Sequence, residues 1–328
     1  MAKRAKRKYW VGFDLGGTKM LAAVFDQDFE LVASQRRKTR PGDGLGSAVA
    51  RIVETIDQAL EQAGVRRSQV GGIGFGVPAF VNLDRGVVLK APNLGWEDVP
   101  LRRRLARELE APVVVANDVD AGTYGEYRFG AGRRARCVVG VFPGTGIGGG
   151  CVYDGVILRG RRVSCLEIGH IIVQPDGPLC GCGQRGCLEA VASRLAIAGE
   201  AAKAAYRGQA PHLLQLAGTD VAKIRSGVLR ASIEAGDKVV ERIVRHAARQ
   251  LGQALVGVVN LLAPDVIVLG GGLAEEMPDL FCEEAREAIR KGVIPALRDV
   301  ARIAPARLGD NACVLGAAAL AADAAQQG

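Results

Sequence analysis

Apolar residues occur along the chain in short runs that end at glycine-containing turns, and amphipathic stretches separate these runs. The run Pro112–Ala116 contains three consecutive valines without polar alternation, a pattern that predicts a strand buried on both faces. Similar short runs predict strands at Tyr9–Phe13, Met20–Phe25, Gly71–Phe75, Cys137–Phe142, Gly150–Tyr153 and Val266–Leu269, and a hairpin-like stretch at Val81–Leu89. Helices are predicted at about Leu45–Ala63, Leu101–Leu109, Glu189–Tyr206, Lys238–Leu262, Asp279–Lys291 and Val314–Ala322. This mixture of strands and helices predicts an α/β fold.

Two parts of the chain begin alike, with a strand, a glycine turn that contains Gly-Thr, and a second strand. The first part starts at Tyr9 and the second at Cys137, and the 328 residues suffice for about two domains. The repeat predicts two α/β halves that present glycine turns at the carboxyl ends of strands, where α/β proteins bind ligands. We expect a smaller domain at residues 9–117 plus 313–328, a larger one at residues 118–312, and a disordered basic tail at residues 1–8.

The composition is that of a globular protein in water with a small basic surplus. Apolar residues make up 48% of the chain and charged residues 24%. The net charge is +8, and five of these charges lie within residues 3–8, so we favour a solvated tail over a nucleic-acid site. No hydrophobic segment follows the basic start and no apolar run reaches ~18 residues, so we expect neither a signal peptide nor a membrane span, but a cytoplasmic protein.

The first glycine turn, Asp14-Leu15-Gly16-Gly17-Thr18-Lys19, directly follows the first predicted strand. Glycines let backbone amides approach an oxyanion, while Thr18 adds a hydroxyl donor and Lys19 a cation. Asp14 could hold Mg²⁺ through water, because this ion dehydrates reluctantly. A tight hairpin turn with a capping aspartate would explain the same residues, so this turn alone does not identify a phosphate site.

Two further glycine turns follow predicted strands. Gly144–Gly150 satisfies G-x-G-x-x-G, but a dinucleotide site needs a helix next, and Cys151–Gly155 predicts a strand and a turn instead. We therefore exclude a Rossmann site, and the lack of G-x-x-x-x-G-K-[ST] in the sequence excludes a P-loop. Gly270–Gly272 could lie against a base or ribose, or could simply connect a strand to a helix. Three such turns together favour a phosphorylated ligand more than any one of them does.

Asn117-Asp118 lies where the triple-valine strand ends. A carboxylate at this position could accept a proton from a substrate hydroxyl, as phosphoryl transfer requires, and Asn117 could hydrogen-bond a neighbouring hydroxyl. Asp118 could equally cap a helix at Val119–Tyr127, and the spacing does not choose between these roles.

Cysteines are concentrated in one glycine-rich segment. Four candidate metal ligands lie within eighteen residues: His170, Cys180, Cys182 and Cys187. Three thiolates and an imidazole form the tetrahedral set that structural zinc prefers, and a full set predicts a structural site, although buried or redox cysteines are the alternative. Glu167 and Glu189 flank the segment, and could either accept hydrogen bonds from substrate hydroxyls or be exposed charges.

Taken together, these residues resemble the ROK family of bacterial sugar kinases and sugar-responsive repressors. The resemblance runs from Asp14 to the closing helix and is carried by Asp14–Lys19, Ala91–Leu94 with Trp96, Asn117-Asp118, Gly125-Glu126, Gly130–Gly132, Gly144–Gly150, Glu167–His170, Cys180–Glu189, and Asn260 through Gly272. It implies an actin-like (ribonuclease H-like) two-domain sugar kinase fold with an interdomain cleft.

The resemblance also implies roles for individual residues, with Asp118 as the base that takes the proton of the sugar 6-hydroxyl. The sugar would be bound by backbone groups near Gly76 and by Asn93, Asn117, Glu167, His170 and Glu189. ATP would be bound by Asp14, Gly16, Gly17, Thr18, Lys19, Thr145, Gly146, Gly270, Gly271 and Gly272. The first two turns would hold phosphates and the third would face adenosine. His170 would offer the sugar the ring nitrogen that zinc leaves free.

The sequence is most similar to the ATP-dependent glucokinases of this family, which implies phosphoryl transfer to the 6-hydroxyl of glucose, Mg²⁺ with ATP, and a dimer or tetramer. One residue departs from the pattern: Ala79 stands where the family usually has glycine, near the expected sugar pocket. N-acetylmannosamine, N-acetylglucosamine or fructose therefore stay open as substrates. The basic charge balance also permits polyphosphate as the donor. Family repressors carry an N-terminal helix-turn-helix domain, and the eight residues before the first strand are too few for one, so we expect a kinase and not a sugar-responsive transcriptional regulator.

Overall fold

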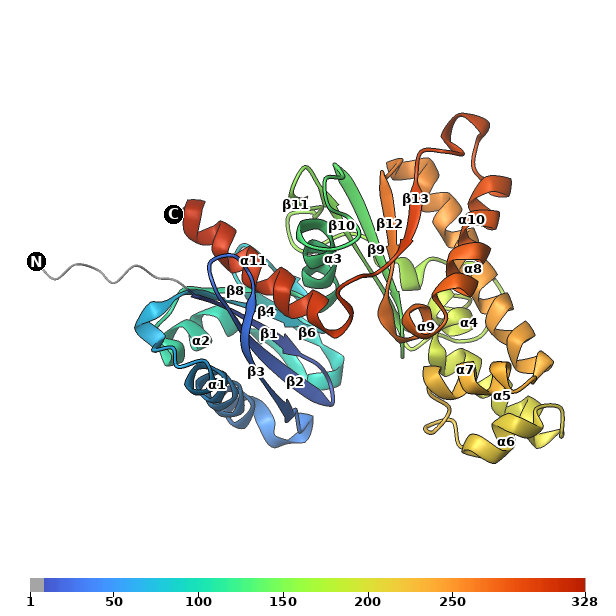
Figure 1. Ribbon diagram of the computed structural model, residues 1–328, viewed down its shortest axis with the longest axis horizontal. Helices are drawn as coiled ribbons and strands as arrows, with labels where there is room; N and C mark the ends of the chain where they lie inside the picture. The colour runs from blue at the N-terminus through green and yellow to red at the C-terminus, as the bar shows by residue number, and fades with distance from the viewer. Residues whose placement is uncertain (1–8, 328) are drawn as a thin grey trace, which may run out of the picture. The chain divides into compact units, whose positions relative to one another are not determined.

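A computed structural model of the chain describes residues 9–327 and shows a mixed α/β protein (Figure 1). Its residues form two compact units. Unit 1 contains the described residues up to Arg134, Gly150–Cys165 and those from Asp310 onward, and unit 2 contains Ala135–Gly149 and Leu166–Gly309. This division differs from the expected domains, because residues 118–134, 150–165 and 310–312 group with unit 1. The predicted basic tail, residues 1–8, lies outside the described residues.

Unit 1 is built around two sheets. The strands of these two sheets are β1 (Tyr9–Leu15), β2 (Lys19–Phe25), β3 (Leu31–Lys38), β4 (Val70–Val77), β5 (Phe80–Asn82), β6 (Val87–Ala91), β7 (Trp96–Val99) and β8 (Val113–Asn117). The unit also contains the short strand β11 (Val156–Ile157), which belongs to a third sheet. Its helices are α1 (Gly44–Gln62), α2 (Leu101–Leu109), α3 (Asp118–Arg128) and α11 (Ala312–Gln327). The larger sheet has the order β3-β2-β1-β4-β8, and the smaller one β5-β6-β7.

Three parallel strands of the larger sheet, β1, β4 and β8, end at the same edge. In this register Asp14 of β1 pairs with Gly76 of β4, and Val77 of β4 pairs with Asn117 of β8. Residues that are 103 positions apart in the sequence, from Asp14 to Asn117, therefore meet at one end of the sheet.

One face of this sheet is lined by glycines and receives α11. A Cβ atom on Gly12 would lie 1.8 Å from the carbonyl oxygen of Val314, and one on Gly74 would lie 1.8 Å from that of Ala317. The helix backbone thus occupies the space that side chains would need. Since strand residues alternate between faces, the glycines of β4 at 72, 74 and 76 share the α11 face.

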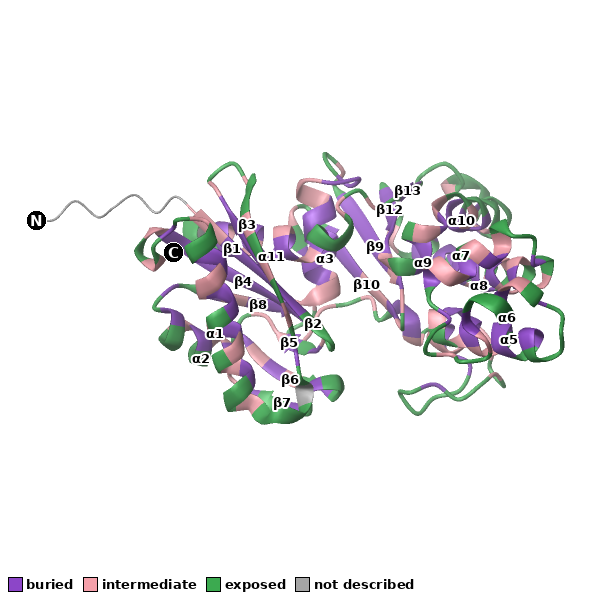
Figure 2. Cartoon of the chain, turned by 60° about the horizontal axis from the view of Figure 1, so that its bottom comes forward, coloured by how far each residue is buried: buried purple, intermediate pink, exposed green. Residues whose placement is uncertain are grey.

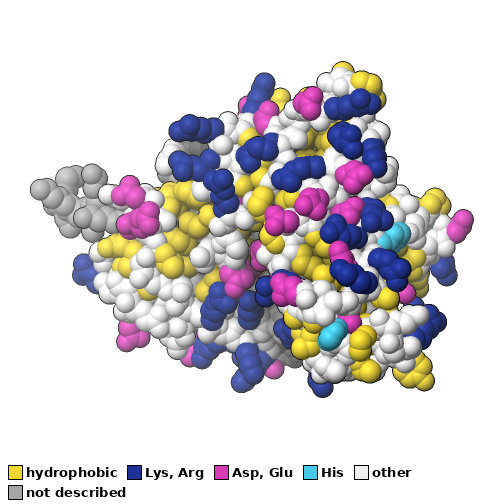
Figure 3. All heavy atoms as spheres, turned by 45° about the vertical axis from the view of Figure 1, so that its right-hand side comes forward, with side chains coloured by type: hydrophobic (Ala, Val, Ile, Leu, Met, Phe, Trp, Pro, Cys, Tyr) yellow, Lys and Arg dark blue, Asp and Glu magenta, His cyan; other side chains and the backbone are white. Residues whose placement is uncertain are grey.

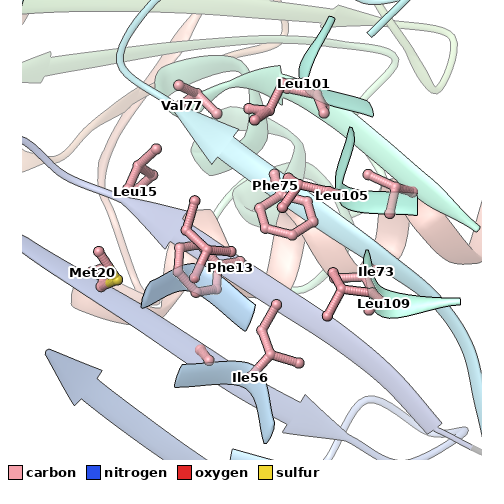
Figure 4. Packing of buried hydrophobic residues seen from close by; sticks show 14 of the residues in the cluster. Phe13, Leu15, Met20, Ile56, Ile73, Phe75, Val77, Leu101, Leu105 and Leu109 are labelled. Atoms are coloured by element: carbon pink, nitrogen blue, oxygen red, sulfur yellow. The ribbon is translucent and has the colours of Figure 1, made fainter. Parts of the chain in front are cut away.

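The opposite face carries the large apolar side chains of the unit. Phe13 and Phe75 pack with ring centroids 5.2 Å apart, and Ile56 of α1 and Leu105 of α2 lie in the same buried cluster (Figure 4). Burial of these side chains holds α1 and α2 on the sheet.

Unit 2 contains most of the second five-stranded sheet and its covering helices. The sheet order is β11-β10-β9-β12-β13, with bounds β9 (Cys137–Pro143), β10 (Ile147–Tyr153), β11 (Val156–Ile157), β12 (Val266–Leu269) and β13 (Arg302–Pro305). The helices are α4 (Leu188–Ala192), α5 (Arg194–Tyr206), α6 (Pro211–Ala217), α7 (Ser226–Glu234), α8 (Lys238–Leu262), α9 (Gly271–Glu276) and α10 (Pro278–Gly292). The unit boundary falls within β10, between Gly149 and Gly150.

The strands β2, β4, β9 and β12 are almost entirely buried, whereas the edge strand β3 is largely exposed and the helices expose one face (Figure 2). At the surface, Lys and Arg side chains alternate with Asp and Glu on the face that Figure 3 shows. Helices α8 and α10 are linked by the buried Glu284 of α10, which accepts hydrogen bonds from Arg245 at 3.2 Å and from Arg249 at 2.9 Å. Among residues 9–327, no helix combines the length and apolar character needed to span a membrane.

Most predicted elements are confirmed, and the helices at Leu101–Leu109 and Lys238–Leu262 have the predicted bounds. The predicted helix Glu189–Tyr206 is instead divided at Ser193, whose side chain caps α5 by accepting the Ala196 N–H at 3.2 Å. The edge strands β3 and β13 and the helices α6 and α7 had not been predicted, since their sequences have few apolar residues or are short.

Candidate active site

Asp118 follows β8 directly and is the first residue of α3. The N-cap of this helix is Asn117, whose Oδ1 accepts hydrogen bonds from the N–H groups of Val119 at 2.8 Å and Asp120 at 3.1 Å. The Asn117 amide nitrogen donates to the carbonyl of Ala79 at 3.1 Å. The N-cap is therefore Asn117 and not Asp118, although Asp118 Oδ1 also accepts the Val119 N–H at 3.0 Å. Asp118 is instead a carboxylate at the N-terminus of an 11-residue helix.

Asp14, at the end of β1, lies near Asp118. Burial raises the pKa of Asp14 to about 6, and the Asp118 carboxylate adds to the increase, whereas a hydrogen bond with Cys313 and the charge of Lys19 oppose it. Burial and the same two carboxylates hold the pKa of the Cys313 thiol well above its usual range, so the thiol stays protonated and donates to Asp14. Gly76 leaves room for this cluster, since a Cβ there would lie 2.2 Å from Cys313 Sγ and 3.2 Å from Asp118 Cα.

The first glycine turn joins β1 to β2 and is held by Thr39. The Thr39 hydroxyl donates to the carbonyl of Gly16 at 2.6 Å, and its N–H donates to that of Thr18 at 3.0 Å. Thr39 is buried, whereas Gly17 and Thr18 are exposed. These two hydrogen bonds hold the backbone of the turn in place, while Gly17 and Thr18 stay accessible at the surface.

The cation predicted for this turn has a partner of its own. The Lys19 ammonium lies 3.5 Å from Asp310, which also accepts a hydrogen bond from Arg36 at 2.9 Å. The hydrogen bond from Arg36 is the main cause that lowers the pKa of Asp310. A phosphate binding at this turn would meet Lys19 next to a carboxylate.

Asn93, a predicted sugar ligand, lies in the short 3₁₀ turn Pro92–Leu94 between β6 and β7. Its neighbour Leu94 is buried and anchors the turn, while Asn93 itself is exposed. Ala79 is buried, and its carbonyl is the acceptor of the Asn117 amide.

In unit 2, the four predicted metal ligands lie together. The ligand atoms of His170, Cys180, Cys182 and Cys187 all lie within 4.8 Å of one another. Cys180 Sγ is 3.8 Å from His170 Nδ1, and Cys182 Sγ is 3.7 Å from Cys187 Sγ. Ligands bound at zinc-type distances in a tetrahedron are about 3.3–3.8 Å apart, so these spacings fit one tetrahedral ion. The sulfur separation is too long for a disulfide.

The two flanking glutamates lie beside this cluster. Glu189, at the start of α4, accepts a hydrogen bond from the Ile147 N–H at 2.9 Å through Oε2, and its Oε1 is 3.9 Å from Cys180 Sγ. Partial burial raises the pKa of Glu167, with a further increase from Glu189 and a decrease from His170. The segment that can hold a metal therefore also positions two carboxylates.

The second and third glycine turns also lie in unit 2. Residues 144–146 connect β9 to β10, with the Gly144 N–H donating to the Gly146 carbonyl at 2.8 Å. The chain continues as a strand, which confirms that G-x-G-x-x-G is not a Rossmann turn here. Gly270 leads from β12 into α9, and Gly271 has a φ of 72°, in the region that favours glycine. A Cβ on Gly271 would lie 2.9 Å from the Pro143 carbonyl, so the two turns are in contact.

Two residues that build these sites were not identified from the sequence. Cys313 carries no local motif, and only the packing of α11 on β4 brings it to Asp14. Thr39 lies in a polar stretch after β3, and an isolated threonine gives no signal of its position. The sequence does predict that His170, Cys180, Cys182 and Cys187 lie together, because they are close along the chain.

Comparisons with known proteins agree with the sequence motifs. The sequence profile of the ROK family matches residues 10–324. The glucokinase of Halalkalibacterium halodurans is 35% identical over 315 residues, covering 94% of this chain and 93% of that protein. The crystal structure of a ROK family glucokinase from Streptomyces griseus with glucose and AMPPNP has a TM-score of 0.84 at 34% identity and covers 98% and 100% of the two chains. A ROK family transcriptional regulator, a homologue of the Escherichia coli Mlc protein, has a TM-score of 0.85 at 26% identity and covers 97% and 78%.

Proposed function

The chain belongs to the ROK family, as its motifs predicted, and has the actin-like two-domain fold of these sugar kinases; from this we propose that it is a glucokinase that transfers the γ-phosphoryl group of ATP to the 6-hydroxyl of glucose. The observation that carries the proposal is the carboxylate of Asp118, which is positioned by the Asn117 cap at the carboxyl end of β8. The 35% identity to a glucokinase over nearly the whole chain supports glucose as the sugar.

In the proposed reaction Asp118 accepts the proton of the sugar 6-hydroxyl. The sugar 6-oxygen then bonds to the γ-phosphorus of ATP, and the bond between this phosphorus and the oxygen that leaves with ADP breaks. Phosphoryl transfer depends on positioning and charge neutralisation more than on covalent help from the protein. Asn117 already makes three hydrogen bonds within the protein, so its first role is to orient Asp118. Asn93 and backbone groups near Gly76 are proposed as further sugar contacts.

In unit 2 we propose that Glu167 and Glu189 accept hydrogen bonds from the other sugar hydroxyls, and that His170 also hydrogen-bonds one of them. His170 Nδ1 lies 3.8 Å from Cys180 Sγ, so we propose that Nδ1 binds the metal and that Nε2 is left for the sugar. Zinc is the metal whose ligand preference fits the Cys₃His set, and it would act as a structural cross-link of this segment. A sugar that leaves one of these polar groups unpaired would lose about 1–3 kcal/mol of binding.

We propose that the phosphates of ATP contact the turns at Gly16–Thr18 and Thr145–Gly146, and that Gly270–Gly272 faces adenosine. Mg²⁺ bound with ATP supplies neutralisation of the phosphate charge, and Asp14 would hold it through water. A pKa of about 6 leaves Asp14 mostly ionised at pH 7, as this role requires.

A regulator without enzymatic activity is the second candidate function. Fold similarity does not distinguish the two, since the glucokinase and the regulator structures match about equally well. The greater identity to the glucokinase structure, 34% against 26% for the regulator structure, favours the enzyme. Salt-dependent DNA binding without sugar phosphorylation would favour the regulator.

The test is phosphorylation of a sugar panel, measured as ADP release, with ATP and polyphosphate compared as donors. Glucose, N-acetylmannosamine, N-acetylglucosamine and fructose form the panel, because Ala79 leaves the preference open. Asp118→Asn should lower kcat by at least about 10²-fold while glucose still binds in calorimetry. The matched control is Asp28→Asn, an exposed aspartate between β2 and β3. Near-normal turnover by Asp118→Asn would reject the assignment of the base.

A further inference from the structure

One arginine of unit 2 lies directly against the Thr145–Gly146 turn. Arg194 is the first residue of α5, and its backbone N–H donates to the carbonyl of Gly144 at 2.8 Å. Its Nη2 donates to the Thr145 hydroxyl at 3.0 Å, and its Nη1 donates to the carbonyl of Ile224 at 3.4 Å. Both ends of the residue are therefore attached to, or next to, the same turn.

In the part of the chain that the structure describes, the guanidinium of Arg194 hydrogen-bonds only uncharged groups. Its side-chain partners are two uncharged oxygens, and within residues 9–327 no carboxylate lies at ion-pair distance from its guanidinium. By contrast, Arg230 of α7 pairs with Glu276 at 2.9 Å. A guanidinium has five N–H donors, so Arg194 keeps donors for a further acceptor. A half-buried cation with neutral partners at a glycine turn is suited to an anionic ligand.

The third glycine turn is connected to the same arginine. Ile224, which accepts from Arg194, begins the segment Ile224–Ser226, and the Ser226 hydroxyl lies 3.3 Å from the position of a Cβ on Gly272. The neighbouring Gly271 packs on Pro143 at the end of β9. Two glycine turns and one arginine that has no carboxylate partner among residues 9–327 thus form a continuous cluster within unit 2.

We propose that Arg194 binds the phosphoryl oxygens of the nucleotide donor at the Thr145–Gly146 turn. This inference rests on the proposed kinase function and adds a side chain to a turn that otherwise offers backbone amides and one hydroxyl. The planar fork of a guanidinium matches two oxygens of a phosphate, whereas a lysine ammonium offers only a point charge. Thr145 holds the fork in place, so little side-chain freedom is lost when the ligand binds.

The test compares Arg194→Met and Arg194→Lys with the wild-type protein in calorimetric titrations of adenosine, AMP and Mg·ATP. Arg194→Met should weaken ATP binding by about tenfold or more and raise the KM for ATP, while its affinity for adenosine and its KM for glucose stay unchanged. The affinity of Arg194→Lys for ATP should lie between that of Arg194→Met and that of the wild type. The control is Arg207→Met, which removes the same charge from the far end of α5, about 20 Å away along the helix axis.

Two results would overturn the assignment. One is an ATP affinity of Arg194→Met equal to that of the wild type, and the other is an equal loss of affinity for adenosine and ATP, which would mean that the arginine only maintains the turn. The parallel measurement of wild-type sugar phosphorylation keeps the proposals separate. If the wild type binds ATP through Arg194 but phosphorylates no sugar, the glucokinase assignment fails and the phosphate contact stands.

Discussion

The contact of β4 with α11 allows a prediction to be calculated from the coordinates. In Gly76→Ala, the new Cβ would lie 2.2 Å from Cys313 Sγ, whereas ordinary contacts between such atoms are about 3.5–4.0 Å. The thiol or the helix must therefore move. Overpacking of this kind costs about 1–3 kcal/mol, which for a unit of this size lowers the melting temperature by roughly 2–10 °C.

The clash involves a side-chain atom, so a second substitution should relieve it. Cys313→Ala removes Sγ, and the double variant Gly76→Ala/Cys313→Ala should recover most of the loss caused by Gly76→Ala. We expect a coupling free energy of about 1–2 kcal/mol between the two substitutions. Gly74→Ala is the matched control, because its Cβ would meet the backbone oxygen of Ala317 at 1.8 Å, and no side-chain truncation can relieve that contact.

The assay is urea unfolding of the wild type, the three single variants, and the double variants Gly76→Ala/Cys313→Ala and Gly74→Ala/Cys313→Ala, at one pH without ligands. The packing argument is refuted if the losses from Gly76→Ala and Cys313→Ala simply add, or if Cys313→Ala rescues Gly74→Ala to the same extent. A change of the urea slope would indicate altered unfolding cooperativity and would be checked by two spectroscopic probes.

Three further predictions concern the site residues. Cys182→Ser should reduce bound zinc from about one ion per chain and weaken glucose binding, as measured by elemental analysis and calorimetry, and a wild-type protein without zinc would contradict the metal assignment. The pKa of Asp14 is raised from 3.8 to about 6, mainly by burial, so its contribution to stability is present below pH 3.8 and is lost as the pH rises through 6. Asp14→Asn should therefore be more stable than the wild type at pH 7, by on the order of 1–3 kcal/mol, and this gain should disappear near pH 4 in urea titrations; a gain that does not depend on pH would contradict the cause. Ala79→Gly should broaden or shift sugar preference, and an unchanged panel would show that the methyl group does not reach the sugar.

Local patterns determined much of this protein. The triple-valine strand, the α2 and α8 helices, and the rejection of a Rossmann turn follow from residue spacing within a few turns of chain. The candidate metal site was equally accessible, because its four ligands lie within the segment 170–187 and metal-ligand spacing is itself a local property. The sequence also singled out the Asn117-Asp118 pair, but it did not show that Asn117 is the N-cap of α3 and that Asp118 is the first residue of the helix.

Only the tertiary structure decided which distant residues meet. The sequence contains no signal that Cys313 of the last helix lies beside Asp14 of the first strand, or that Arg194 donates to Thr145. The reason is physical: these contacts depend on how closely α11 approaches the glycine face of β4, and on how α5 and the Ile224–Ser226 segment pack around the end of β9. Such distances arise from the packing of whole elements, whereas the chain pattern records only which face of each element is apolar.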